Sequence, residues 1–186
     1  NDILDMSKIE AGKMRLSPAL IDPVDAVDGA VKLARRRCAD REIALMFDPD
    51  DDLPDINGDH RAIKQMTFNL ITNSIKFTDP GGEIHVTIGL EGQWIVIRVV
   101  DTGIGIAPED LPRLAQPFEQ VATLESQQRN VRGTGLGLAL TKSFAEMHGG
   151  YITIESTLGV GTTVSIFLPT LKTNNTSERT RETFAV

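Results

Sequence analysis

The sequence predicts an α+β fold, a two-layer sandwich in which a mixed, mainly antiparallel sheet carries helices on one face. Four β-rich segments form two hairpin-like pairs, residues 83–90 with 94–100 and residues 151–156 with 162–168. Three further segments have helical periodicity or helix start and stop signals: residues 22–39, 59–77 and 134–148. Because the strands pair as hairpins and helices lie between them, one sheet covered by helices is the simplest arrangement.

Composition and charge narrow the class of protein. The chain has 186 residues, 40% of them hydrophobic and 24% charged, which is enough for one globular domain with an ordinary core. A net charge of −7 disfavours sequence-independent binding to nucleic acid or to an anionic membrane. The single cysteine, Cys38, cannot form an internal disulfide, and no apolar run approaches the ~20 residues of a membrane span. We therefore expect a cytoplasmic domain.

The first half of the chain has clear helix signals. Residues 1–14 have the pattern of a helix too short to be stable alone, so we expect the end of a longer one. Asp22 is a good N-cap and Pro23 suits a first turn, so a helix should begin there and run to about Ala39. Asp59 caps the next helix in the same way. Short strands are expected at 15–21 and 43–47.

The second half alternates hairpins with less regular segments. Glu91 and Gly92 join the first hairpin, and residues 108–116 predict a short helix. Residues 118–132 have no periodicity, and a loop of that length is usually a lid or a binding loop. The polar residues 172–186 predict a disordered tail.

The stretch from Asn69 to Thr78, NLITNSIKFT, carries an unusual polar stripe. Asn69, Asn73 and Lys76 are spaced i, i+4 and i+7, which places them on one face of a helix. The intervening apolar residues suit the buried face. By itself the stripe is weak evidence, because asparagine and lysine exposed on a helix are usually just solvated.

Two glycine-rich segments also contain groups that could bind a ligand. In DTGIGI, Asp101 ends a strand and is followed by Gly103 and Gly105, which allow a tight turn and close approach of a ligand. The carboxylate could accept a hydrogen bond from an exocyclic amine such as that of adenine, or the segment could be a plain turn.

In GTGLGL, residues 133–138 open a helix, where free N–H groups can bind phosphate. The order G-x-G-x-G without a preceding strand excludes a dinucleotide-binding fingerprint, and no Walker pattern is present.

The order of five segments carries a family resemblance. They are NLITNSIKFT (69–78), DTGIGI (101–106), PFEQ (117–120), GTGLGL (133–138) and GVGTT (159–163). Together they resemble the N, G1, F, G2 and G3 boxes of the catalytic ATP-binding domain of sensor histidine kinases, which has the Bergerat (GHKL, HATPase_c) fold. The resemblance implies a catalytic domain over 15–171, followed by the tail. Residues 1–14 resemble the end of a dimerisation and histidine-phosphotransfer domain with its linker, in the manner of PleC- and DivJ-like kinases.

The resemblance implies ATP and Mg2+ as cofactors and assigns a role to each matching residue. Asn73 would coordinate Mg2+, Asn69 would lie near the phosphates or a metal-bound water, and Lys76 would meet phosphate. Asp101 would bind the adenine amine. The pocket around it would be formed by Phe77, Gly103, Gly105 and Thr162.

In the second glycine segment, the resemblance implies a hinge for the lid and N–H groups aimed at phosphate. The matching residues are Gly133, Thr134, Gly135, Leu136 and Gly137, with Arg132 or Arg129 reaching the γ-phosphate. Two positions depart from the family pattern: Leu114 stands where phenylalanine is usual, and Ser74 where alanine is commoner. Neither removes a residue expected to touch nucleotide.

The resemblance implies phosphoryl transfer to a histidine rather than hydrolysis. Related ATPases of the gyrase, Hsp90 and MutL types place a glutamate where Asn69 stands, and an amide cannot act as a general base. None of His60, His85 and His148 has the sequence context of the acceptor, which is expected on a separate dimerisation domain. The full protein would then be a homodimer, would serve a response regulator, and could be anchored in the inner membrane. A nucleotide-sensing pseudokinase and an anti-sigma type of serine kinase remain as alternatives.

Overall fold

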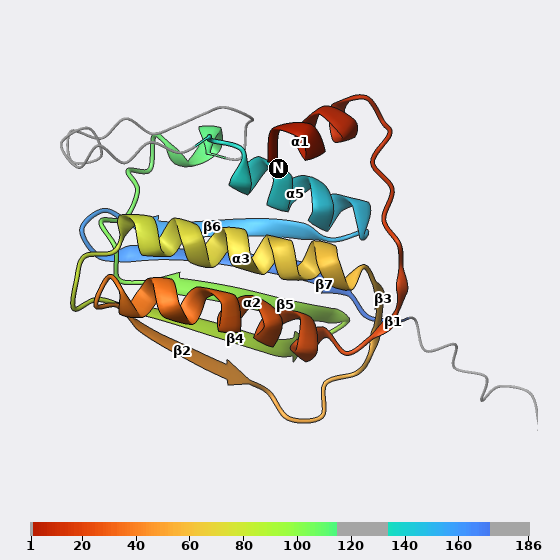
Figure 1. Cartoon of the computed structure of the whole chain (residues 1–186), viewed down its shortest axis with the longest axis horizontal. Helices are drawn as coiled ribbons and strands as arrows, with labels where there is room; N and C mark the ends of the chain where they lie inside the picture. The colour runs from red at the N-terminus through yellow and green to blue at the C-terminus, as the bar shows by residue number, and fades with distance from the viewer. Residues whose placement is uncertain (1, 115–133, 172–186) are drawn as a thin grey trace, which may run out of the picture.

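The computed structural model describes residues 2–114 and 134–171, and its central element is a five-stranded sheet (Figure 1). The strand order is β2-β4-β5-β7-β6. β2 runs parallel to β4, and the other neighbouring pairs are antiparallel. The strands are β2 (Ala44–Pro49), β4 (Glu83–Glu91), β5 (Trp94–Asp101), β6 (Tyr151–Thr157) and β7 (Gly161–Pro169). The predicted α+β class with a mixed, mainly antiparallel sheet is confirmed.

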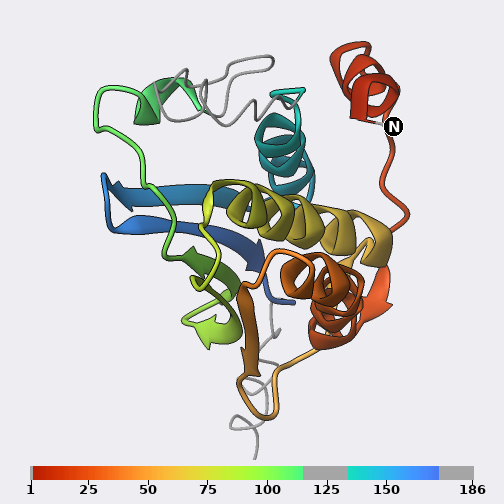
Figure 2. The ribbon, with the colours of Figure 1, turned by 60° about the vertical axis from the view of Figure 1, so that its left-hand side comes forward.

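Three helices cover one face of this sheet, as Figure 2 shows from the side. They are α2 (Pro23–Ala39), α3 (His60–Phe77) and α5 (Gly137–Met147). α3 lies between the other two and packs against both of them. α1 (Asp2–Glu10) lies beside α5, outside the two layers. Within the described ranges no helix is long and apolar enough to cross a membrane.

The core lies between the sheet and α3. Alternate residues of β4 and β5 point toward the helices and are at most 1% exposed, namely Ile84, Val86, Ile88, Ile95, Ile97 and Val99. On the helix side, Ile63, Met66 and Ile71 are fully buried. The opposite sheet face carries an aromatic row in which Tyr151 stacks on Phe167 at a centroid distance of 4.4 Å. The two-residue period of the strands therefore separates a core face from an outer face.

The two predicted hairpins are present with the expected turns. In the first, Glu91 pairs with Trp94 and Gly92 adopts φ +60, the left-handed conformation that a two-residue turn requires. In the second, Thr157 pairs with Gly161. One strand of each hairpin, β5 and β7, then pairs with the other inside the sheet.

Some predicted elements were wrong in extent. α1 ends at Glu10 rather than at residue 14, because Gly12 (φ +64) turns the chain and the N–H of Lys13 bonds back to Lys8. Within 15–21 only β1 (Ala19–Ile21) is a strand, and its antiparallel partner β3 (Ile56–Gly58) was not predicted. The described part of 108–116 contains only the 3-10 turn η1 (Leu111–Arg113).

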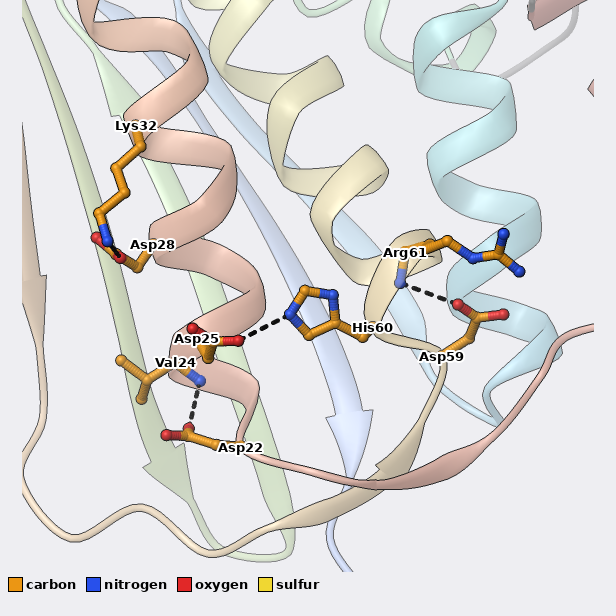
Figure 3. A network of polar contacts seen from close by, with 8 residues as sticks. All are labelled: Asp22, Val24, Asp25, Asp28, Lys32, Asp59, His60 and Arg61. Atoms are coloured by element: carbon orange, nitrogen blue, oxygen red, sulfur yellow. Dashed lines mark hydrogen bonds and ion pairs between the residues drawn. The ribbon is translucent and has the colours of Figure 1, made fainter.

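Asp59 connects the start of α3 to two other parts of the chain. One carboxylate oxygen accepts from the N–H groups of Arg61 (2.9 Å, drawn in Figure 3) and Ala62 (3.2 Å). The other accepts from the N–H of Ser17, at 2.8 Å. The N–H of Asp59 itself donates to Nε2 of His148, at 3.0 Å. The cap thus holds the segment before β1 and the end of α5 at one point.

The hydrogen bonds of this cap lower the pKa of Asp59. Burial alone would raise the pKa of Asp59, but the hydrogen bonds from Ser17, Ala62 and Arg61 together hold it below its ordinary value of 3.8. The ionised carboxylate is therefore the form that stabilises the folded state. This contribution is present above the ordinary pKa and is lost as the pH falls through the lowered one.

We predict that Asp59→Ala lowers the free energy of unfolding by about 2 kcal/mol, because it removes the cap and leaves the Ser17 N–H without its acceptor. The matched variant is Asp22→Ala, which removes an exposed cap with one hydrogen bond to Val24 and should cost about 1 kcal/mol or less. Urea unfolding at pH 7 measures both. Equal losses in the two variants would contradict the central role given to Asp59.

Candidate functional site

Asp101, the last residue of β5, has its carboxylate buried and hydrogen-bonded from three elements. Oδ2 accepts from the hydroxyl of Ser74 on α3, at 2.8 Å. Oδ1 accepts from the N–H of Gly103 at 2.9 Å and from the N–H of Thr162 on β7 at 3.3 Å. The side chain is therefore fixed between the helical layer and the sheet.

Burial raises the pKa of Asp101, and the hydrogen bonds from Ser74, Gly103 and Thr162 oppose the rise without cancelling it. All three partners are donors, so they favour the ionised carboxylate. An ionised carboxylate can accept about four hydrogen bonds. The donors among the described residues therefore leave one acceptor position for a ligand that carries a donor, such as an amine.

The turn after Asp101 packs against the β6–β7 hairpin. The N–H of Ile106 donates to the hydroxyl of Ser156, which in turn donates to the carbonyl of Gly161, at 2.8 and 2.9 Å. The same hydroxyl lies 2.9 Å from Oγ1 of Thr162, the residue that faces it across the hairpin. Thr162 therefore contacts Asp101 through its backbone and Ser156 through its side chain. Sequence reasoning missed Ser156, although its cross-strand position could have indicated it.

The glycines around Asp101 are required by close backbone packing. A Cβ on Gly103 would lie 2.7 Å from the carbonyl oxygen of Phe77. Gly105 has φ +68, and a Cβ there would lie 2.0 Å from the carbonyl oxygen of Thr157. A Cβ on Gly161 (φ +146) would lie 1.9 Å from the carbonyl oxygen of Asp101. Close contact with neighbouring backbone is thus sufficient to require glycine at these three positions.

The polar stripe of α3 faces the start of α5. The side-chain amide of Asn69 donates to the carbonyl of Gly137 at 3.3 Å. A Cβ on Gly137 would lie 3.8 Å from Asn69 and 3.9 Å from Nδ2 of Asn73. The two amides and the first residue of α5 therefore form one neighbourhood, and both asparagines are only partly buried.

Lys76 and Phe77 lie at the end of the same helix. Nζ of Lys76 lies 4.7 Å from the ring centroid of Phe77, within range of a cation–π contact. Burial lowers the pKa of Lys76. The carbonyl of Phe77 accepts from the N–H of Ile104, which joins α3 to the turn after Asp101. The end of α3 is therefore joined through its backbone to the turn after Asp101.

The second glycine segment is described from Thr134 onward. Thr134 accepts a hydrogen bond from the N–H of Leu136 at 3.3 Å, and Gly135 has φ +70. Leu136 is fully buried, so its side chain belongs to the core. α5 begins at Gly137 rather than at Thr134. The other positions assigned here, Arg129, Arg132 and Gly133, lie outside the described residues, as does PFEQ.

Metal-ligating side chains do not cluster in the described part of the chain. No group of three or more His, Cys, Asp and Glu side chains there could hold a metal ion. The buried hydroxyl of Thr78, just beyond α3, has no hydrogen-bond partner among those residues. The donor set of the site is thus one carboxylate, two amides, one lysine and backbone N–H groups.

The sequence matches one family model and several curated proteins. Residues 58–172 match the family model "Histidine kinase-, DNA gyrase B-, and HSP90-like ATPase". The chain is 51% identical over 174 residues to the non-motile and phage-resistance protein of Caulobacter vibrioides, covering 91% of this chain and 20% of that protein. It is 46% identical over 173 residues to histidine protein kinase DivJ of the same organism, covering 92% of this chain and 28% of the relative. The chain thus spans less than a third of the length of these curated relatives.

Solved structures agree with the fold. Full-length ShkA in complex with AMPPNP superposes with a TM-score of 0.79 at 27% identity, covering 91% of this chain and 35% of that one. The nucleotide-free catalytic domain of histidine kinase ThkA superposes with a TM-score of 0.72 at 22% identity, covering 83% of this chain and 99% of that one. The predicted Bergerat fold is confirmed.

We predict that Gly161→Ala lowers the free energy of unfolding by more than about 3 kcal/mol, because the new Cβ would collide with the backbone of Asp101. Gly159→Ala is the matched control in the same turn. Gly159 also has a positive φ (+77), but a Cβ there meets nothing within 4 Å, so the cost should be about 1–2 kcal/mol. Thermal or urea unfolding separates the two, and similar losses would show that backbone crowding does not explain Gly161.

Proposed function

The chain belongs to the family of histidine kinase-, DNA gyrase B- and HSP90-like ATPases, and from that premise we propose that it is the catalytic ATP-binding domain of a sensor histidine kinase. The observation that carries the proposal is the buried carboxylate of Asp101, which keeps one acceptor position for an exocyclic amine. The amides of α3 and the start of α5 supply a second, phosphate-binding region. The names of the relatives favour histidine kinases within this broad family.

In this proposal ATP supplies the phosphoryl group, and the residues of the chain bind and orient it. Asp101 accepts a hydrogen bond from the adenine amine, with Phe77, Gly103, Gly105 and Thr162 around the base. Asn69 and Lys76 face the phosphates, the lysine as a point charge. The helix dipole and the free N–H groups at the start of α5 favour the same negative charge.

Mg2+ fits this donor set through Asn73. A neutral amide oxygen is a suitable ligand for a hard cation that keeps several waters and takes its remaining ligands from phosphate oxygens. Because the described residues offer no carboxylate cluster, we expect metal binding to depend on bound nucleotide. Arg129 or Arg132 would complete the phosphate contacts.

Transfer to a histidine is favoured over hydrolysis by the residue at position 69. The amide of Asn69 donates to Gly137 and cannot remove a proton from water at neutral pH. Phosphoryl transfer needs positioning and charge stabilisation more than a strong base. His60 contacts Asp25, and His148 contacts the backbone of Asp59 and Phe144, so both have structural partners. We place the acceptor histidine on a separate dimerisation domain.

The remaining assignments follow from the same proposal. Residues 1–14 would be the end of the dimerisation domain with its linker, and 15–171 the catalytic domain. The full protein would be a homodimer that passes the phosphoryl group to a response regulator. The free, buried thiol of Cys38 suits a reducing cytoplasm.

We predict that the chain binds Mg-ATP and that Asp101→Asn weakens binding roughly 10- to 100-fold, because a charged acceptor for the amine is lost. Calorimetric titration with a non-hydrolysable analogue measures this. Asp51→Asn, which removes the same charge from an exposed loop, should bind normally. No binding by the unmodified chain would contradict the ATP-binding assignment.

The same titration has an expected pH dependence. Because burial raises the pKa of Asp101 above its ordinary value of 3.8, the carboxylate gains a proton as the pH falls through the raised value. Protonation replaces an acceptor with a donor, so the affinity should fall on the acid side. Asp101→Asn should not show this loss of affinity at acid pH. An identical pH profile in both proteins would contradict the assignment of the loss to Asp101.

We further predict phosphoryl transfer in trans. With Mg-ATP and a separately purified dimerisation domain from a close relative, acid-labile phosphate should appear on that domain and not on this chain. Asn73→Asp should reduce the rate by at least tenfold, because it places negative charge beside the phosphates. Normal ATP binding without any transfer would instead support the pseudokinase alternative.

A further inference from the structure

We infer that Ser74 is a positioning residue for base recognition: its hydroxyl holds the Asp101 carboxylate in the orientation that accepts the 6-amino group of adenine. This inference rests on the proposed function and identifies which side chain sets its selectivity for an amino-purine.

The contact between Ser74 and Asp101 joins two layers of the fold. The hydroxyl of Ser74 donates to Oδ2 of Asp101 at 2.8 Å. Ser74 is 6% exposed and Asp101 is 8% exposed, so water competes little for this hydrogen bond. A hydrogen bond to a buried charged group is stronger than one between neutral groups.

The other hydroxyls of α3 behave differently. The hydroxyl of Thr67 donates to the carbonyl of Ile63, and that of Thr72 donates to the carbonyl of Phe68. Both are the local i to i−4 bonds that serine and threonine commonly make inside a helix. Ser74 instead reaches across to β5. Its hydroxyl is therefore directed at the site rather than at its own helix.

The distribution of donors identifies the oxygen left for the ligand. Oδ1 accepts from two backbone N–H groups, those of Gly103 and Thr162, which match its two lone pairs. Oδ2 accepts only from Ser74 among the described residues, so it keeps a lone pair. An incoming amine must then share Oδ2 with the serine hydroxyl. Without that hydroxyl, only the two N–H groups at Oδ1 hold the carboxylate, and Oδ2 has no donor among the described residues to fix its orientation.

This assignment separates two kinds of ligand. A purine nucleotide with a 6-amino group uses Oδ2, whereas the same nucleotide with hydrogen at that position does not. If Ser74 acts through Asp101 on the amine, its removal should affect only the first ligand. A serine that merely stabilises α3 would affect both ligands equally.

The test compares Mg2+ complexes of ATP and of purine riboside triphosphate, which lacks the amine, on the full chain by calorimetry. The unmodified chain should prefer ATP by roughly tenfold or more. Ser74→Ala should reduce this preference by about fivefold while leaving the affinity for the amine-free nucleotide within about twofold. Ser74→Thr, which keeps a hydroxyl, should restore most of the preference. Thr67→Val is the matched control, since it removes a buried hydroxyl from the same helix and should change neither affinity.

The possible results distinguish failure of the inference about Ser74 from failure of the proposed function. Equal weakening of both nucleotides by Ser74→Ala, or an unchanged preference, would overturn the inference and leave the proposed function standing. Binding of neither nucleotide by the unmodified chain would overturn the proposed function itself. Equal binding of both by the unmodified chain would show that Asp101 does not read the amine, and would overturn the inference as well.

Discussion

The structure depends on satisfying one buried carboxylate, that of Asp101. A buried ion without partners would cost several kcal/mol, so the fold must bring donors to it. They come from α3, from the turn after β5 and from β7, which are distant in sequence. The close packing at Gly103 and Gly161 follows from this requirement, because a side chain at either position would push a donor segment away.

The pairing of α3 with α5 is fixed at two places. At one, His148 after α5 accepts from the N–H of Asp59 at the start of α3. Since Nδ1 of His148 lies 2.7 Å from the carbonyl of Phe144, it must donate, and Nε2 is left as an acceptor. At the other, Asn69 donates to Gly137. The first contact also includes the segment before β1 through Ser17, so this segment and the proposed phosphate-binding region are connected through one helix pair.

The sequence predicted the features that depend on neighbouring residues. The Asp22 and Asp59 caps and both hairpins have local signals, and all are present. β3 was missed because three residues carry no periodicity and their strand character depends on pairing with β1. The hydrogen bond from Ser74 to Asp101 joins residues 27 positions apart, so only the fold reveals this contact. The ligand-binding explanation predicted for Gly103 and Gly105 is not needed, because backbone crowding is sufficient to require glycine there.

The two halves of the site differ in the number and strength of the hydrogen bonds that hold their residues in place. At the proposed base end, Asp101 accepts hydrogen bonds from Ser74 on α3, from Gly103 in the turn after β5 and from Thr162 on β7, and Thr162 also contacts Ser156. At the proposed phosphate end, one hydrogen bond of 3.3 Å joins two neutral groups, the side-chain amide of Asn69 and the carbonyl of Gly137 at the start of α5. A neutral contact can be exchanged for one to a ligand without leaving a buried charge unpaired. Recognition of the base can therefore be preorganised while the phosphate end adjusts to its ligand, as the proposed transfer of the γ-phosphate to a separate acceptor requires.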